Sequence, residues 1–108
     1  MGIFRIFSVI LLFSFSLKTD LKADSEKMLL GLEVFNNKAM CGTCHVLKAA
    51  GSTGDIGPDL DDLKPSDEQV RGVVTEWLGV MPAFGEEGLL TSEEIDAVSY
   101  YVTHSSEK

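Results

Sequence analysis

The chain has 108 residues and a formal net charge of −8, with 17 acidic side chains against nine basic ones. This length allows one compact domain, so we expect a single core and one main site. The acidic balance excludes nucleic acid and anionic membrane surfaces as good partners, because both repel a negatively charged protein.

Residues 1–23 have the pattern of a secretory signal peptide. Arg5 supplies the positive start, residues 6–17 are an apolar run, and Ala23 follows a short polar stretch. The apolar run has 12 residues, fewer than the roughly 20 that a bilayer-spanning helix needs. We therefore predict export to the periplasm and cleavage after Ala23, which leaves residues 24–108 as the mature domain. We expect no stable membrane insertion unless the signal stays uncleaved and acts as an anchor.

Cleavage would leave six basic and 16 acidic side chains, a formal charge of −10. Such a charge favours encounter with a partner that carries a basic docking patch, and salt would weaken that encounter. Solubility alone is the other explanation, since net charge does not by itself fix a partner.

The first predicted helix begins at Asp24 or Ser25, either of which can cap it, and ends near Lys38. Four apolar side chains recur on one face at helical spacing: Met28, Leu29, Leu32 and Phe35. Residues 40–63 follow, with glycine or proline at five positions, too often for a long helix. This segment is therefore predicted to be a loop that holds, at most, short helical turns.

The second helix is marked by a capping box of Ser66 and Gln69. Its apolar face carries Val70, Val73, Val74 and Trp77. The helix stops before Gly79, because glycine loosens the backbone and a proline follows shortly after it. Met81 is therefore expected in an extended loop.

A second capping box, Thr91 with Glu94, predicts a last helix that runs to about His104. Its buried stripe comprises Ile95, Val98, Tyr101 and Val102. Residues 105–108 are expected to be a frayed tail. Because no strand pattern competes with these helices, the sequence predicts an all-α fold.

Cys41, Cys44 and His45 form a C-x-x-C-H motif, the arrangement of a c-type haem attachment site. Two thiols three residues apart can each add to a vinyl group of one haem, and the adjacent histidine is then presented to the iron. Three other uses of these residues are a thioredoxin-like dithiol, half of a zinc site and a short disulfide. The helical context argues against the dithiol, the shortage of further ligands argues against zinc, and a disulfide leaves His45 unexplained.

A sixth iron ligand has four candidates: Met28, Met40, Met81 and His104. Met81 is the best of them, because its loop lets the thioether point inward outside any helix stripe. Met28 lies on an apolar helix face, Met40 is too close to the motif to reach the other side of a haem, and His104 suits a helix C-terminus. Filling a gap in the core is the alternative role for Met81.

With these residues assembled, the chain resembles the class I c-type cytochromes over nearly all of residues 24–104. The resemblance implies a small cytochrome c fold, with helices packed around one covalently bound haem. In that family a glycine and an aromatic residue on the first helix cross an aromatic residue on the last. Gly31, Phe35 and Tyr101 hold the matching positions here.

The family resemblance also covers the two sides of the haem. The family has a Gly-Pro pair whose proline carbonyl accepts a hydrogen bond from the ligand histidine, and Gly57 and Pro58 match it. An ordinary tight turn is the alternative use of this pair. Residues 79–84 resemble the family's distal loop, and Met81 falls where the axial methionine belongs.

Two finer features of the sequence bear on its subfamily. Residues 53–60 and 63–65 are similar to the haem subunits that accompany bacterial sulfite dehydrogenases. Trp77 is a departure, since many relatives have a small residue there. Its indole could donate to a haem propionate or close the apolar face of the second helix.

These features predict a periplasmic one-electron carrier with His/Met ligation rather than an enzyme. A haem enzyme or gas sensor is the first alternative, and it would need an open iron position. The second is a haem subunit bound to a larger periplasmic dehydrogenase, such as a sulfite dehydrogenase. A terminal oxidase is a further possible redox partner.

Overall fold

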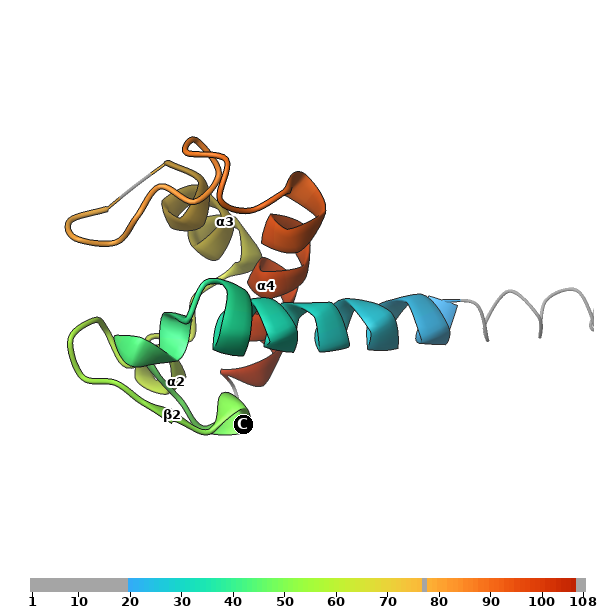
Figure 1. Ribbon diagram of the computed structural model, residues 1–108. Coiled ribbons are helices and arrows are strands. Elements are labelled where there is room, and N and C mark those ends of the chain that lie inside the picture. Colours follow the sequence, from blue (N-terminus) through green and yellow to red (C-terminus); the bar gives the residue numbers. More distant parts are fainter. Residues whose placement is uncertain (1–19, 77, 107–108) are drawn as a thin grey trace, which may run out of the picture.

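The computed structural model describes residues 20–76 and 78–106 and begins with a helix over residues 20–33 (Figure 1). This helix continues directly into a π-helical turn, η1, at Val34–Lys38, so its predicted end near Lys38 is confirmed. The predicted start is wrong, because Asp24 and Ser25 lie inside the helix. Residues 20–27 contain no glycine or proline, and nothing in them stops the helix.

The buried side of this first helix differs in one place from the predicted stripe. Val34 and Phe35 are buried, and Met28 and Leu32 pack against the core. Leu29 is 66% exposed, so its assignment to the buried face is wrong. The amino-terminal part of this helix extends beyond the rest of the domain (Figure 1).

The segment that follows holds short elements, as predicted, and one small hairpin that was not. In chain order they are η2 (Cys41–Thr43), β1 (Val46–Leu47), η3 (Lys48–Ala50), β2 (Ser52–Thr53) and α2 (Leu60–Leu63). β1 pairs antiparallel with β2, with Val46 opposite Thr53. Strands of two residues are too short to leave an alternating pattern, so the hairpin could not be predicted from the sequence.

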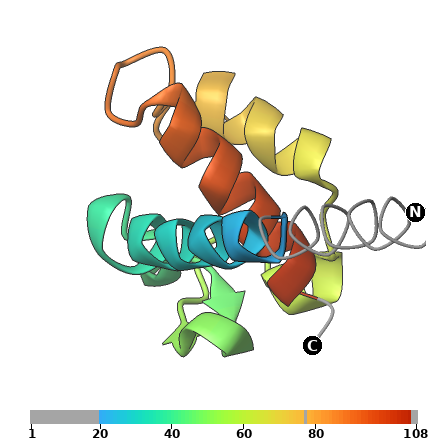
Figure 2. The same ribbon diagram turned by 90° about the vertical axis from the view of Figure 1, so that its right-hand side faces the viewer.

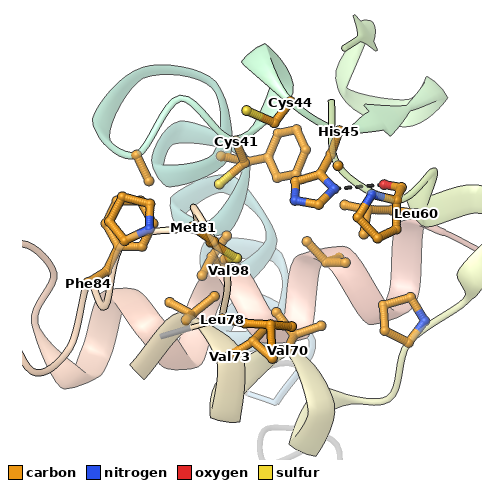
Figure 3. A pocket seen from close by; sticks show the side chains of 18 of the residues that line it. Cys41, Cys44, His45, Leu60, Val70, Val73, Leu78, Met81, Phe84 and Val98 are labelled. Atoms are coloured by element: carbon orange, nitrogen blue, oxygen red, sulfur yellow. Dashed lines mark hydrogen bonds between the residues drawn. The ribbon is translucent and has the colours of Figure 1, made fainter. Parts of the chain in front are cut away.

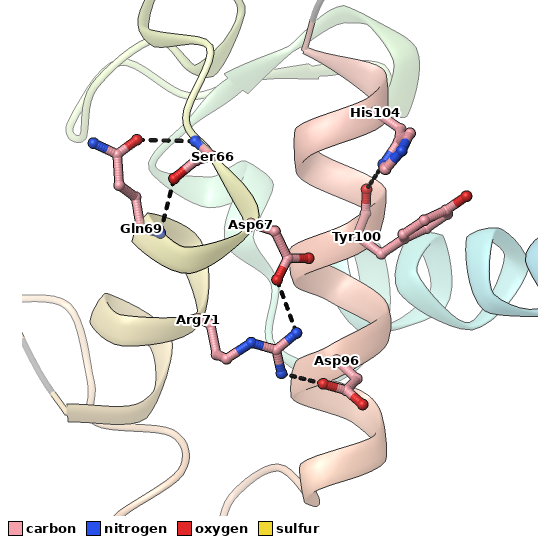
Figure 4. Close-up of polar contacts among 7 residues, drawn as sticks. All are labelled: Ser66, Asp67, Gln69, Arg71, Asp96, Tyr100 and His104. Atoms are coloured by element: carbon pink, nitrogen blue, oxygen red, sulfur yellow. Dashed lines mark hydrogen bonds and ion pairs between the residues drawn. The ribbon is translucent and has the colours of Figure 1, made fainter.

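Helix α3 covers Asp67–Glu76 and begins with the predicted capping box. The Ser66 amide donates to Gln69 Oε1 at 2.9 Å, and the Gln69 amide donates to Ser66 Oγ at 3.2 Å (Figure 4). The helix ends before Gly79, as expected. Trp77 and residues 1–19 lie outside the described residues, so the expectations for Trp77 and for the apolar run of the signal stay predictions.

Helix α4 covers Ser92–Ser105, and its capping box of Thr91 and Glu94 is present in both directions. The predicted frayed tail is wrong at its start, because Ser105 and Ser106 are buried.

No helix within residues 20–76 and 78–106 is long and apolar enough to cross a membrane.

The first helix crosses α4 at a point where a glycine lets the two backbones meet (Figures 1 and 2). A Cβ atom on Gly31 would lie 2.3 Å from the Ala97 carbonyl oxygen and 2.4 Å from Tyr101 Cβ. The Phe35 and Tyr101 rings pack beside this point with centroids 6.1 Å apart. The expected crossing of Gly31, Phe35 and Tyr101 is therefore confirmed.

Helices α3 and α4 lie against each other and share an ion-pair network (Figure 4). Arg71 on α3 pairs with Asp96 on α4 and with Asp67 one turn back, the latter at 2.8 Å. A hollow lies between α3, α4 and the segment after η1.

Candidate cofactor site

The chain turns sharply just before the two cysteines. The π-turn closes with the Ala39 amide donating to the Val34 carbonyl at 2.8 Å, and Met40 adopts a left-handed backbone with φ 51°. A non-glycine residue in that region is strained, and the Thr43 amide, which donates to the Met40 carbonyl at 3.1 Å, helps to hold the turn. The turn leads into η2, where the His45 amide donates to the Cys41 carbonyl at 3.0 Å.

One hollow of about 590 Å³ receives the side chains of this segment (Figure 3). Cys41, Cys44 and His45 line it from one side, and Val70 and Val73 line it from α3 on the other. The remaining walls are mainly apolar and include Phe35, Leu60, Met81, Phe84, Val98 and Val102. The volume and the apolar lining are those of a site for a large, mostly apolar group.

The His45 ring is held by its neighbours in a defined orientation. Its Nδ1 lies 2.7 Å from the Pro58 carbonyl oxygen (Figure 3). A carbonyl can only accept, so Nδ1 carries the proton and Nε2 keeps its lone pair free for a metal. Gly57 packs against the ring so closely that a Cβ atom there would lie 2.5 Å from His45 Cε1.

Two of the four candidate sixth ligands line the hollow, Met81 and Met40. Met81 is placed by a tight turn in which its amide donates to the Leu78 carbonyl at 3.1 Å and Gly79 has φ +62°. Met28 and His104 are not among the residues that line the hollow. The His104 ring instead stacks on Tyr100, and its Nδ1 lies 2.8 Å from the Tyr100 carbonyl oxygen (Figure 4).

The Cys41 thiol does not have the character of a reactive thiolate. Burial raises the pKa of the Cys41 thiol to about 11, which keeps it protonated near neutral pH, whereas a reactive dithiol needs a thiolate. Neither cysteine is in a disulfide. Among the described residues, no group of three or more His, Cys, Asp and Glu side chains is arranged to hold a metal ion.

These residues fit a haem group. Two thiols, one histidine with a free Nε2 and one thioether share a hollow whose walls are mainly apolar. In c-type sites two thiols attach the haem, and the iron takes nitrogen and sulfur donors of the kinds that this histidine and this thioether offer.

Sequence reasoning missed the rim of the hollow. Five large apolar side chains both line it and are more than half exposed: Met40, Ile56, Leu63, Leu78 and Val80. Val80, at the tip of the Met81 turn, is 91% exposed. The signal available in the sequence was apolar residues outside the three long helices, at spacings that fit no helix stripe.

Known proteins similar to this chain agree on one family. The family model described as cytochrome C oxidase, cbb3-type, subunit III matches residues 27–102. Cytochrome c6 of Microcystis aeruginosa is 37% identical over 87 residues, which cover 72% of this chain and 96% of that protein. The crystal structure of the c-type cytochrome SorU from Sinorhizobium meliloti matches with a TM-score of 0.72 and 42% identity, over 78% of this chain and 95% of that one. The chain belongs to the cytochrome c family, whose cofactor is covalently bound haem c.

Proposed function

We propose that this cytochrome carries single electrons: Cys41 and Cys44 would hold one haem covalently, and His45 and Met81 would ligate its iron. The observation that supports this most is that all four side chains line one apolar hollow, while His45 Nδ1 is engaged by Pro58. Bound haem supplies an iron that accepts and releases one electron.

Two protein ligands leave no iron position for a substrate, which is why the proposal is a carrier and not an enzyme. Pro58 orients the His45 ring and increases its basicity through the Nδ1 proton. The apolar walls exclude water, and Met81 as a thioether ligand would favour the reduced iron more than a second nitrogen donor would.

The rim supports a short-lived encounter with another redox protein. Asp55 and Asp62 are exposed and adjoin Ile56 and Leu63, so carboxylates border this part of the apolar rim. A partner with an apolar patch surrounded by basic side chains would complement it, whether a periplasmic dehydrogenase or a terminal oxidase. The proposed compartment is the periplasm, reached by the signal in residues 1–23.

The proposal is tested with the protein matured in a periplasm that attaches haem. A pyridine haemochrome spectrum reports haem type, thioether linkage and stoichiometry, and we expect one haem with two thioether bonds. Met81→Ala should lower the reduction potential, abolish the methionine-to-iron charge-transfer band of the oxidised form and open the reduced iron to carbon monoxide.

Met40→Ala is the matched control, because Met40 also lines the hollow but stands beside Cys41. It should leave the charge-transfer band in place. An unchanged potential in Met81→Ala, or ready binding of carbon monoxide by the wild-type protein, would overturn the assignment of Met81.

A second candidate is a haem subunit held permanently by a larger periplasmic dehydrogenase, of which a sulfite dehydrogenase is an example. The exposed apolar rim and the likeness of residues 53–60 to such subunits favour it. Purification from the native host at low and at high salt separates the two, since a tight subunit stays with its enzyme at both.

A further inference from the structure

Two segments run side by side on the histidine side of the hollow and contact each other with a constant offset. The Gly57 amide donates to the Cys44 carbonyl at 2.7 Å, and His45 Nδ1 donates to the Pro58 carbonyl at 2.7 Å. The third contact lies three residues further along both segments, where the Lys48 amide donates to Asp61 Oδ2 at 2.9 Å. Each contact joins residues 13 apart, so together they fix one register.

Asp61 makes the third of these contacts from a helix that is itself held in place. It is in α2, whose amino end is capped by the Asp59 side chain, which accepts from the Asp61 and Asp62 amides. Leu60, the neighbour of Asp61, is in the core. The carboxylate therefore reaches Lys48 from a defined position.

The other oxygen of this carboxylate is unusual. Asp61 Oδ1 is buried and has no hydrogen-bond partner among the residues that the structure describes. An unpartnered buried oxygen costs about 1–3 kcal/mol of folding stability, so Asp61 Oδ1 does not stabilise the fold. The hydrogen bond of this carboxylate to the Lys48 amide is made by Oδ2.

We propose that Asp61 is a positioning residue for His45. By holding the Lys48 amide it sets the register of residues 44–48 against residues 57–61, and that register presents the Pro58 carbonyl to His45 Nδ1. The inference rests on the proposed role of His45 as an iron ligand. Loosening the contact weakens the hydrogen bond to His45, lowers the basicity of the ligand and so raises the reduction potential.

The test compares variants of the haem-loaded protein that remove the contact from either side. Asp61→Ala removes the acceptor, and Lys48→Pro removes the donor at the first position of a helical turn, after an extended residue that tolerates a following proline. Asp61→Asn keeps an acceptor oxygen without the charge, and Lys48→Ala keeps the amide without the side chain. Asp62→Asn removes the same charge one residue away.

The readouts are solvent exchange of the His45 Nδ1 proton, followed by NMR in the reduced protein, and the reduction potential. Asp61→Ala and Lys48→Pro should accelerate exchange about tenfold, roughly the loss of one hydrogen bond, and raise the potential. Lys48→Ala, Asp62→Asn and Asp61→Asn should exchange as the wild type does. If Asp61→Ala yields too little holoprotein, the comparison of Lys48→Pro with Lys48→Ala tests the inference by itself.

Two outcomes would overturn the inference: wild-type exchange in both Asp61→Ala and Lys48→Pro, or equally fast exchange in Asp61→Asn, which would make the charge responsible. Failure of the proposed function looks different. In that case the wild-type protein itself lacks a His45 ring proton shifted by a bound haem, whatever the variants do.

Discussion

At the scale of single residues, the contact between Gly57 and the His45 ring decides how the histidine points. The ring is bounded by Gly57 and tied to Pro58, and neither contact depends on a side chain of those two residues. Glycine is needed here for close approach rather than for an unusual backbone, since Gly57 is not among the residues with positive φ.

Gly57→Ala should displace the His45 ring, because the new methyl group would lie 2.5 Å from Cε1. We expect less holoprotein and a shifted reduction potential in what is recovered. Pro58→Ala is the control, since it keeps the backbone carbonyl that accepts from His45, and it should have a potential near that of the wild type. Absorbance spectra and a redox titration measure both. Equal behaviour of the two variants would contradict the role given to Gly57.

At the scale of elements, the crossing of the first helix and α4 depends on Gly31. Gly31→Ala should destabilise the fold by about 2 kcal/mol or more, because the backbone of Ala97 and Tyr101 Cβ cannot both move away. Gly72→Ala is the matched control in α3, where nothing lies within 4 Å of the new Cβ, and it should stabilise by about 0.5–1 kcal/mol. Urea unfolding of both variants measures the difference. A neutral Gly31→Ala would mean that the helices can separate without cost.

A second prediction concerns Glu94, which caps α4 and pairs with Lys38 at the end of the first helix. The hydrogen bond from Lys38, followed by that from the Thr91 amide, lowers the pKa of Glu94. A lowered pKa contributes stability that is present above the unfolded value of about 4.3 and lost as pH falls through the folded value. Glu94→Gln keeps the capping box but not the charge.

The wild type should therefore exceed Glu94→Gln in unfolding free energy by up to about 1 kcal/mol at neutral pH, and the gap should narrow as the pH falls below the unfolded pKa of about 4.3. Urea unfolding at neutral pH and at several acid pH values tests this. A gap that persists in acid would show that the carboxylate charge is not the cause.

Helices α3 and α4 were predictable because each carries its own start signal. Ser66 with Gln69 and Thr91 with Glu94 are local patterns, and both boxes form as expected. The amino end of the first helix and the β1–β2 hairpin were not, since neither leaves a pattern of its own in the sequence. The motif of Cys41, Cys44 and His45 pointed to the site, whereas the rim and the Asp61 contact depend on tertiary packing.

At the scale of the whole molecule, the surface is acidic with few ion pairs to balance it. The described residues contain three salt bridges, and Arg71 takes part in two of them. These bridges engage only Asp67, Glu94 and Asp96, so most carboxylates in the described part of the chain are outside ion pairs and contribute to the negative field that approaching molecules meet.

Salt should change the speed of electron exchange in opposite directions for partners of opposite charge. Oxidation by a cationic cobalt complex should slow several-fold as ionic strength rises from about 0.01 to about 0.2 M, because screening shortens the range of attraction. Oxidation by an anionic iron complex should accelerate over the same range. Stopped-flow rates measure both, and an absence of salt dependence with either complex would show that the charge does not steer.

The first helix continues through residues 20–23, the stretch just before the expected cleavage point. Cleavage after Ala23 would remove residues 20–23, about one turn of the described helix, together with the residues before them. It would create a new amino end at Asp24. Asp24 and Ser25 are good cap residues, and the carboxylates of Asp24 and Glu26 suit the positive end of the helix dipole. The residues that lie inside the helix in the full chain would then form its first turn in the mature one, so maturation would need no refolding of this helix.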